Sequence, residues 1–202
     1  MNGRYIRFSD ETNALDYLER ASEFIKQTLT DDRAWKWVIL SLHSALYGFA
    51  ISACKHSDYN SVVRTTKKGV KKLITFDEAL RMCKDHSRMA TLSGGRPLNL
   101  SSSQEYSIKL LKKKLRNKFE HRIPGIWSIE IHGLPRISID ILDVVRFLTV
   151  ETHRYQHLNQ SQRRKIKSLV FQSKKLLRKC SLHLELLALE ESTIKQTAVV
   201  HN

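Results

Sequence analysis

The chain has 202 residues, which is enough for one folded domain with a hydrophobic core. Its three cysteines, Cys54, Cys83 and Cys180, are odd in number and form no C-x-x-C pair, so neither a disulfide framework nor a zinc cluster is encoded. The first residues, 1–14, lack the tripartite pattern of a secretory signal. We therefore expect an unprocessed protein in the reducing cytoplasm.

The net charge of +15 is concentrated in three short blocks at residues 64–72, 109–122 and 163–179, which hold twenty of the 35 Lys and Arg residues. Glu120 is the one acidic residue in these blocks. Cations lined up against phosphates release counterions and so bind polyanions without sequence preference. The charge predicts a nucleic-acid partner, with a merely well-solvated basic surface as the alternative and a membrane surface disfavoured.

The N-terminal third predicts two helices. The first runs from about Asp10 to Thr28, and the second begins at a Thr30 cap that is followed by two aspartates. The second helix contains an uncharged stretch, Trp37 to Cys54, that is just long enough to span a membrane. Serine, histidine and glycine residues interrupt this stretch, so we interpret it as the buried core helix of a bundle.

Capping boxes mark the next two helices. Residues 57–74 are polar and basic and predict a loop, and a third helix begins at Thr75 with Glu78 three residues later. Residues 87–103 predict a long loop. A fourth helix begins at Ser102 with Glu105 and ends near Arg122, because the residue that precedes Pro124 avoids helical backbone angles.

The remaining chain predicts a hairpin at residues 126–139, a helix at 139–151, and a long basic helix at about 162–191 that packs on the bundle or on another chain. The expected fold is all-α, a bundle of four to five helices with a small β-hairpin excursion and a long basic C-terminal helix. We assign residues 1–158 to the bundle and residues 159–202 to a basic helical extension.

The fourth helix carries a polar cluster on the side opposite its core stripe. At 100° per residue, the stripe comprises Ile108, Leu111, Leu115 and Phe119. Asn117 and His121 project almost opposite, and Arg116 lies on one flank. Tyr106 and Leu110 share this outer side, where apolar side chains favour contact with a second copy of the helix.

The spacing from Arg116 to His121 is not unique in the chain. Arg81 with His86 and Arg178 with His183 also match R-x-x-x-x-H, and we interpret both as structural. Only the central match has an Asn directly after the Arg, and it lies at the end of a helix, where the partial negative charge of the carbonyl groups favours a protonated His121.

An R-N-x-x-x-H motif on the fourth helix of a small all-α bundle resembles the HEPN family (higher eukaryote and prokaryote nucleotide-binding domains), above all its free-standing prokaryotic and plasmid-borne members. The resemblance covers roughly residues 10–151. It implies a homodimeric, metal-independent endoribonuclease without a cofactor, acting as a toxin or antiviral defence factor, with an antitoxin or nucleotidyltransferase as a possible partner. Carried over to this chain, Arg116 and His121 are catalytic, and Asn117 is the polar residue that commonly follows the Arg.

The residue types suit this chemistry. A histidine near neutral pKa serves as acid or base, and an arginine holds two phosphate oxygens with a planar fork. We expect Lys112, Lys113, Lys114 and Arg122 to hold the RNA strand nearby. The structural alternative is that Arg116 simply pairs with Glu120 at i, i+4 while His121 caps its own helix.

Two other groups of histidines are weaker candidates for a functional site than His121. We expect His43 to be a hydrogen-bonded core histidine, and we assign no metal to His153 and His157 although their i, i+4 spacing can bind one on a helix. Besides the ribonuclease, the sequence leaves two functions open: a non-catalytic basic module that binds RNA or nucleotides, and an all-α scaffold or antitoxin-type partner that uses the C-terminal helix.

Overall fold

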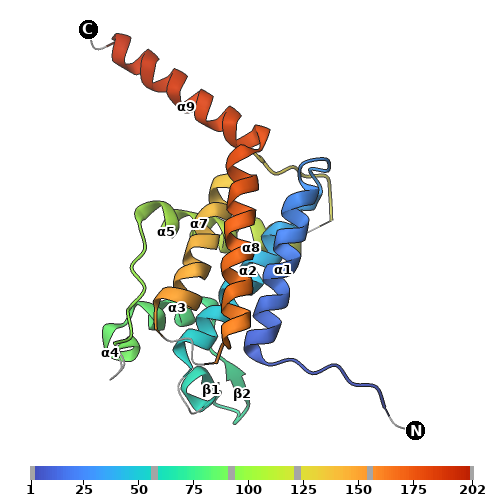
Figure 1. The fold of residues 1–202 in the computed structure, drawn as a ribbon, viewed down its shortest axis with the longest axis vertical. Helices are drawn as coiled ribbons and strands as arrows, with labels where there is room; N and C mark the ends of the chain where they lie inside the picture. Colours follow the sequence, from blue (N-terminus) through green and yellow to red (C-terminus); the bar gives the residue numbers. More distant parts are fainter. Residues whose placement is uncertain (1–2, 56–58, 91–93, 121–123, 154–156, 201–202) are drawn as a thin grey trace.

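A computed structural model describes residues 3–55, 59–90, 94–120, 124–153 and 157–200, with side chains described as far as residue 193. The fold is all-α with one small antiparallel hairpin, as predicted, and Figure 1 shows its arrangement. The α-helices are α1 (Asp10–Gln27), α2 (Ala34–Cys54), α3 (Phe76–Lys84), α4 (His86–Met89), α5 (Ser102–Lys109), α6 (Asn117–Glu120), α7 (Leu134–Arg146), α8 (Gln160–Lys179) and α9 (Ser181–Val200). A 3₁₀ turn, η1 (Tyr59–Val62), and two π-helical segments, η2 (Leu110–Arg116) and η3 (Phe147–Glu151), complete the helical structure.

Helices α1 and α2 pair closely and form the centre of the bundle. A capping box between Ser9 and Thr12 starts α1. Gly48 lies at a close contact between the two helices, since a Cβ atom added there would lie 2.7 Å from the Cβ of Ala14. The apolar stripe of α2 is buried as predicted, with Val38, Leu42 and Leu46 fully inside. The absence of a side chain at Gly48 therefore permits this close packing of α1 on α2.

The start of α2 differs from the prediction. Thr30 lies in a turn, and the cap position is Arg33, which makes no capping hydrogen bond with its side chain. The carboxylate of Asp31 instead accepts a hydrogen bond of 2.9 Å from the backbone N–H of Arg33. Asp31 thus forms a local Asx turn before the helix.

The hairpin lies at a different place from the one predicted. Strands β1 (Val63–Thr65) and β2 (Lys71–Leu73) pair antiparallel with Arg64 opposite Lys72, inside the basic block that predicted a loop. Gly69 has a φ of 75° and closes the connecting turn. Strands of only three residues, half of whose side chains are charged, give no alternating signal, which explains the wrong prediction.

Residues 126–139, predicted as a hairpin, enter helix α7 instead. Pro135 occupies the first turn of α7, where its missing N–H has no partner to lose. Ile137, Ile141 and Val145 then follow at helical spacing and are buried. The alternation before Gly133 belongs to a segment without regular structure.

Capping boxes start α3 and α5. The box from Thr75 to Glu78 is confirmed. The box at α5 joins Ser101 to Gln104, one residue before the predicted pair, because the serine run offers two matching registers. Between α2 and α3, the buried thiols of Cys54 and Cys83 lie 3.2 Å apart.

The predicted long C-terminal helix is two helices. Cys180 adopts an extended conformation (ψ 151°) that separates α8 from α9. Helix α8 packs against α1 and α7, and Ile166, Val170 and Leu177 join the same hydrophobic core as the rest of the bundle. The expected extension from residue 159 therefore begins with a helix that packs on the bundle, whereas α9 projects away from it (Figure 1).

One helix in the described ranges, α2, has the length and hydropathy to cross a membrane. In the fold, 72% of its apolar window is buried against other helices. The apolar character of α2 thus serves the bundle core, in agreement with the interpretation of the sequence.

Candidate nucleic-acid interface

The candidate motif lies on one helical rod composed of α5, η2 and α6. The core-facing stripe is confirmed: Ile108, Leu111 and Leu115 are buried, and Phe119 is partly buried. However, residues 110–116 form a π-helix, so positions calculated at 100° per residue do not hold along this part of the rod. The wider π-helical turns end at Arg116, where the helix returns to α-helical geometry.

Arg116 is half-buried and held by its neighbours. Its Nη2 atom lies 2.5 Å from a carboxylate oxygen of Glu120, and its Nη1 atom donates a 3.1 Å hydrogen bond to the side-chain oxygen of Asn117. The i, i+4 ion pair expected in the structural alternative is therefore present. The exposed Asn117 aligns the guanidinium from one side and Glu120 aligns it from the other.

The other predicted site residues separate into three groups. Lys113 and Lys114 are exposed on the rod and line a common groove. Lys112 lies on another side, where it forms an ion pair with Asp77 of α3. His121 and Arg122 lie outside the described residues.

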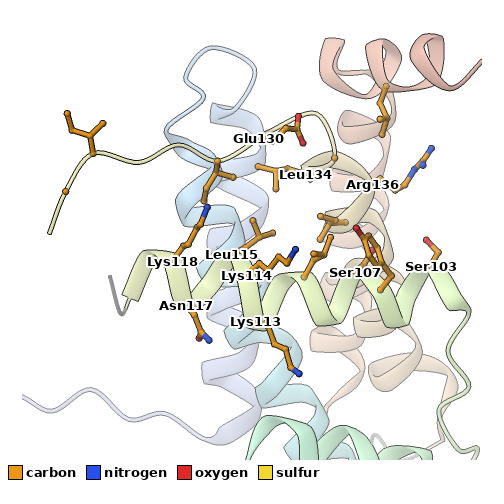
Figure 2. A pocket seen from close by; sticks show the side chains of 18 of the residues that line it. Ser103, Ser107, Lys113, Lys114, Leu115, Asn117, Lys118, Glu130, Leu134 and Arg136 are labelled. Carbon is orange, nitrogen blue, oxygen red and sulfur yellow. The ribbon is translucent and has the colours of Figure 1, made fainter. Parts of the chain in front are cut away.

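The groove that Lys113 and Lys114 line, here called the motif groove, has a volume of about 1290 Å³ and runs between the rod, residues 124–137 and one residue of α9 (Figure 2). Its polar lining from the rod comprises Ser103, Ser107, Lys113, Lys114, Asn117 and Lys118. Figure 2 shows Lys114 and Lys118 on the side that faces the segment carrying Glu130, whereas Lys113 and Asn117 point away from that segment. The rod thus presents amino groups on two sides.

The far wall of the motif groove is fixed by contacts that the sequence did not predict. Lys118 donates to the carbonyl oxygen of Ser128 at 3.4 Å, and Trp127 packs on Phe119 with ring centroids 5.4 Å apart. Arg136 lines the groove and makes two bonds, of 2.5 and 2.7 Å, to the carboxylate of Glu190 in α9. In the sequence, the only feature that could have marked Arg136 as a residue of the groove is its position directly after Pro135.

His132 links the same wall to α9. Its ring nitrogens lie 2.7 Å from a carboxylate oxygen of Glu130 and 3.3 Å from one of Glu185. The hydrogen bond to Glu130 and the negative charges of both carboxylates raise the pKa of His132, against a smaller effect of desolvation. His132 therefore bridges the segment before α7 and the base of α9.

His43 is brought close to Arg116 by the packing of α2 against η2. Its ring stacks on Phe76 with centroids 4.7 Å apart and is half-buried. Burial, followed by the positive charges of Arg116 and Lys112, lowers the pKa of His43 to about 4. At neutral pH this imidazole is uncharged, beside two cations, and neither its spacing nor its apolar neighbours in the sequence indicated this location.

The remaining candidates do not form sites. His153 lies in a bend with a φ of 57° and His157 lies in a turn, so the two do not share a helix face. Arg81 and His86 fall on different helices, α3 and α4, and Arg178 and His183 fall on α8 and α9. Within the described ranges, no three His, Cys, Asp or Glu side chains cluster as metal ligands.

Comparisons of this chain with models of known protein families, with curated proteins and with solved structures find no match.

Proposed function

We propose that the protein is a metal-independent endoribonuclease of the HEPN type that binds RNA in the motif groove and uses Arg116, Asn117 and His121 at a homodimer interface. The observation that carries the proposal is the guanidinium of Arg116, held at the end of the π-helical segment by Asn117 and Glu120 beside a lysine-lined groove. As an expected setting, we propose a cytoplasmic toxin or antiviral defence factor that an antitoxin or a nucleotidyltransferase partner regulates.

The proposed reaction is a transesterification within the RNA. A base removes the proton of a ribose 2′-hydroxyl, the 2′-oxygen bonds to the adjacent phosphorus, and the bond from phosphorus to the 5′-oxygen breaks. An acid gives its proton to the leaving 5′-oxygen, so the products carry a cyclic 2′,3′-phosphate and a 5′-hydroxyl. Arg116 stabilises the additional negative charge on the phosphate, and His121 of each subunit supplies acid or base catalysis.

The pairing of Arg116 with Glu120 is compatible with phosphate binding. Both side chains are partly exposed, at 30% and 38%, so the pair contributes only a few tenths of a kcal/mol to stability, on the order of other exposed i, i+4 pairs. A phosphate accepts the same bidentate hydrogen bonds as a carboxylate. Substrate binding is therefore an exchange of one anion for another at an aligned guanidinium.

The exposed apolar surface beside the motif supports the homodimer. Tyr106 is 63% exposed and Ile126 is fully exposed, and both line the motif groove. Trp127, which packs on Phe119, is a further exposed aromatic residue close by. Large apolar side chains around a polar cluster are typical of a surface that a second copy covers.

The test is RNA cleavage in EDTA by the intact protein, compared with Arg116→Ala and His121→Ala. We expect single-stranded RNA to be cut to cyclic phosphate ends, and each substitution to reduce the rate by about 10²- to 10⁴-fold while RNA binding changes by much less. Arg20→Ala is the matched control, because Arg20 is also an exposed arginine, paired with Glu23 at 2.9 Å on α1. Unchanged cleavage by both motif variants contradicts the assignment.

A second candidate is a non-catalytic module that binds RNA or nucleotides, favoured by the lysines of the motif groove and by the ion pair of Arg116 with Glu120. RNA binding without cleavage by the parent protein supports this candidate. Light scattering tests the assembly separately: a monomer at the concentration of the cleavage assay contradicts the composite site.

A further inference from the structure

Helix α8 borders a second basic groove that is separate from the motif groove. This groove, here called the α8 groove, has a volume of about 800 Å³ and lies between α8 and the end of α7 with η3. Its lining comprises Arg146, Val150, Lys167, Val170, Phe171, Lys174, Lys175, Arg178 and Lys179. None of these residues lines the motif groove.

Most of the positive charge of the α8 groove is exposed. Lys174 pairs with Asp143, and Arg146 pairs with Glu151 at 3.2 Å. The other four cations, Lys167, Lys175, Arg178 and Lys179, are exposed and pair with none of the carboxylates in the described ranges. Helix α8 itself contains no Asp or Glu, so its own sequence supplies no local counter-charge.

Phe171 lies between these cations and is 69% exposed. Lys167 and Lys175 precede and follow it by four residues, which places all three on one face of the helix. Val170, next to Phe171, is buried and belongs to the floor of the groove. An exposed aromatic ring flanked by amino groups is the combination that stacks an unpaired base and holds the phosphates on either side of it.

The burial of the other apolar residues of α8 distinguishes a nucleic acid from a membrane as the occupant. Ile166, Val170 and Leu177 face the bundle core, so Phe171 is the only large apolar side chain on α8 that is mostly exposed. A helix that lies in a membrane interface needs a continuous apolar face to insert. From Lys167 to Arg178 the cations extend over about 16 Å along the helix, which suits an extended, charged strand.

We propose that the α8 groove is a second RNA-binding site, in which Phe171 stacks on a base of single-stranded RNA while Lys167, Lys175 and Arg178 contact the flanking phosphates. It rests on the proposed function only in taking RNA as the ligand, since it shares no residue with the cleavage site. Its effect is on RNA affinity and on the length of strand that is held, and the cleavage chemistry remains with the motif.

The test measures fluorescence anisotropy of labelled single-stranded RNA in an Arg116→Ala background, in which the proposed cleavage is slowed during the titration. We expect Phe171→Ala to weaken binding by about 5- to 100-fold and Phe171→Trp to retain it. The double variant Lys167→Ala/Lys175→Ala is expected to lower the slope of log affinity against log salt by about 1.4, because two phosphate contacts are lost.

Lys165→Ala is the matched control, because Lys165 lies on the same helix but pairs with Glu19 of α1 at 2.6 Å. It removes one positive charge from the same helix and is expected to leave the affinity unchanged. Thermal unfolding of each variant checks that the exposed substitutions leave the fold intact. If the Phe171→Ala and double-lysine variants bind RNA as tightly as the Arg116→Ala background protein, the proposal is wrong. So does a Phe171→Ala variant that loses binding to anionic vesicles but not to RNA.

Cleavage by the otherwise unmodified protein reports separately on the proposed function. If the protein cuts RNA equally well with and without Phe171 at limiting RNA concentration, the ribonuclease proposal stands and the α8 proposal is wrong. If the protein never cuts RNA but the Phe171→Ala substitution weakens RNA binding, the α8 proposal stands and the ribonuclease proposal is wrong.

Discussion

Two cation–carboxylate pairs of similar length occupy opposite environments in this protein. Lys55 at the end of α2 lies 2.8 Å from Glu11 in α1, and both side chains are only 7% exposed. Arg116 lies 2.5 Å from Glu120 within one helix, and both side chains are partly exposed. The first pair joins two helices through the interior, whereas the second joins neighbouring turns at the surface.

The difference determines what each pair can do. Burial alone raises the pKa of Glu11 and lowers that of Lys55, but their mutual hydrogen bond and opposite charges reverse both shifts. Asp10, 3.1 Å from Lys55, and Ser52, which donates a 3.3 Å hydrogen bond to Glu11, add to the stabilisation of the two charges. Solvent screens the exposed pair, so Arg116 can exchange its carboxylate for a phosphate at little cost. Two ion pairs of similar length therefore differ in kind: the pair of Lys55 with Glu11 is structural, and the pair of Arg116 with Glu120 is exchangeable.

The largest effect is expected from Lys55→Ala. This change leaves the carboxylate of Glu11 buried without its cation, and the free energy of unfolding should fall by about 3–5 kcal/mol. Urea denaturation followed by circular dichroism measures it. Replacing both partners, as Lys55→Met with Glu11→Leu, should restore much of the stability, because no buried charge then remains. A single-variant loss below about 1 kcal/mol contradicts a buried, mutually dependent pair.

A smaller effect is expected from acid, through His43 beside Arg116. The pKa of His43 in the folded protein is lowered to about 4. Between that value and about 6.5, the unfolded chain binds a proton at His43 and the folded protein does not. The contribution of neutral His43 to the free energy of unfolding is therefore fully present above pH 6.5. It declines as the pH falls toward 4, by up to roughly 3 kcal/mol.

The control is the His43→Gln variant, which lacks the titrating imidazole, and it is compared with the parent protein. The difference in unfolding free energy between the two proteins should change across pH 4 to 6.5 and stay constant above it. Replacing Arg116 by Gln removes one of the two cations that hold the pKa down, so the NMR titration of His43 should move upward. A pKa of His43 that stays at its ordinary value of about 6.5 in the parent protein contradicts the packing of α2 against η2.

The sequence predicted the parts of the fold that depend on local patterns. Helical periodicity identified the buried stripe of α2 and the core side of the fourth helix, and the capping box located Thr75 as the start of α3. The break at Cys180 and the π-helix at residues 110–116 carry no Gly or Pro signal, so local patterns did not reveal them. Both depend on how the helices pack, which only the folded chain determines.

The candidate site was predicted in the same unequal way. The i, i+4 pair of Arg116 with Glu120, which the sequence offered as the structural alternative, is present because it is local to one helix, whereas the hydrogen bond from Arg116 to Asn117 was not predicted. Contacts from other elements were missed: His43 from α2 and Arg136 from α7 reach the neighbourhood of the rod through tertiary packing. A single sequence without such contacts could name the helix that carries the motif but not the walls of its groove.

The smallest effect, and the most direct test of an exchangeable pair, is expected from Glu120→Gln. The amide no longer competes as an anion for Arg116, so RNA affinity should rise by about two- to threefold, equivalent to the few tenths of a kcal/mol that an exposed pair contributes. Stability should change by less than about 0.5 kcal/mol. Glu23→Gln is the matched control, because Glu23 forms an exposed pair with Arg20 within one helix, α1, away from the motif. High salt should remove the difference between Glu120→Gln and the parent, since it screens both anions. An affinity that falls, with the control unchanged, shows instead that Glu120 is needed to position Arg116 for RNA.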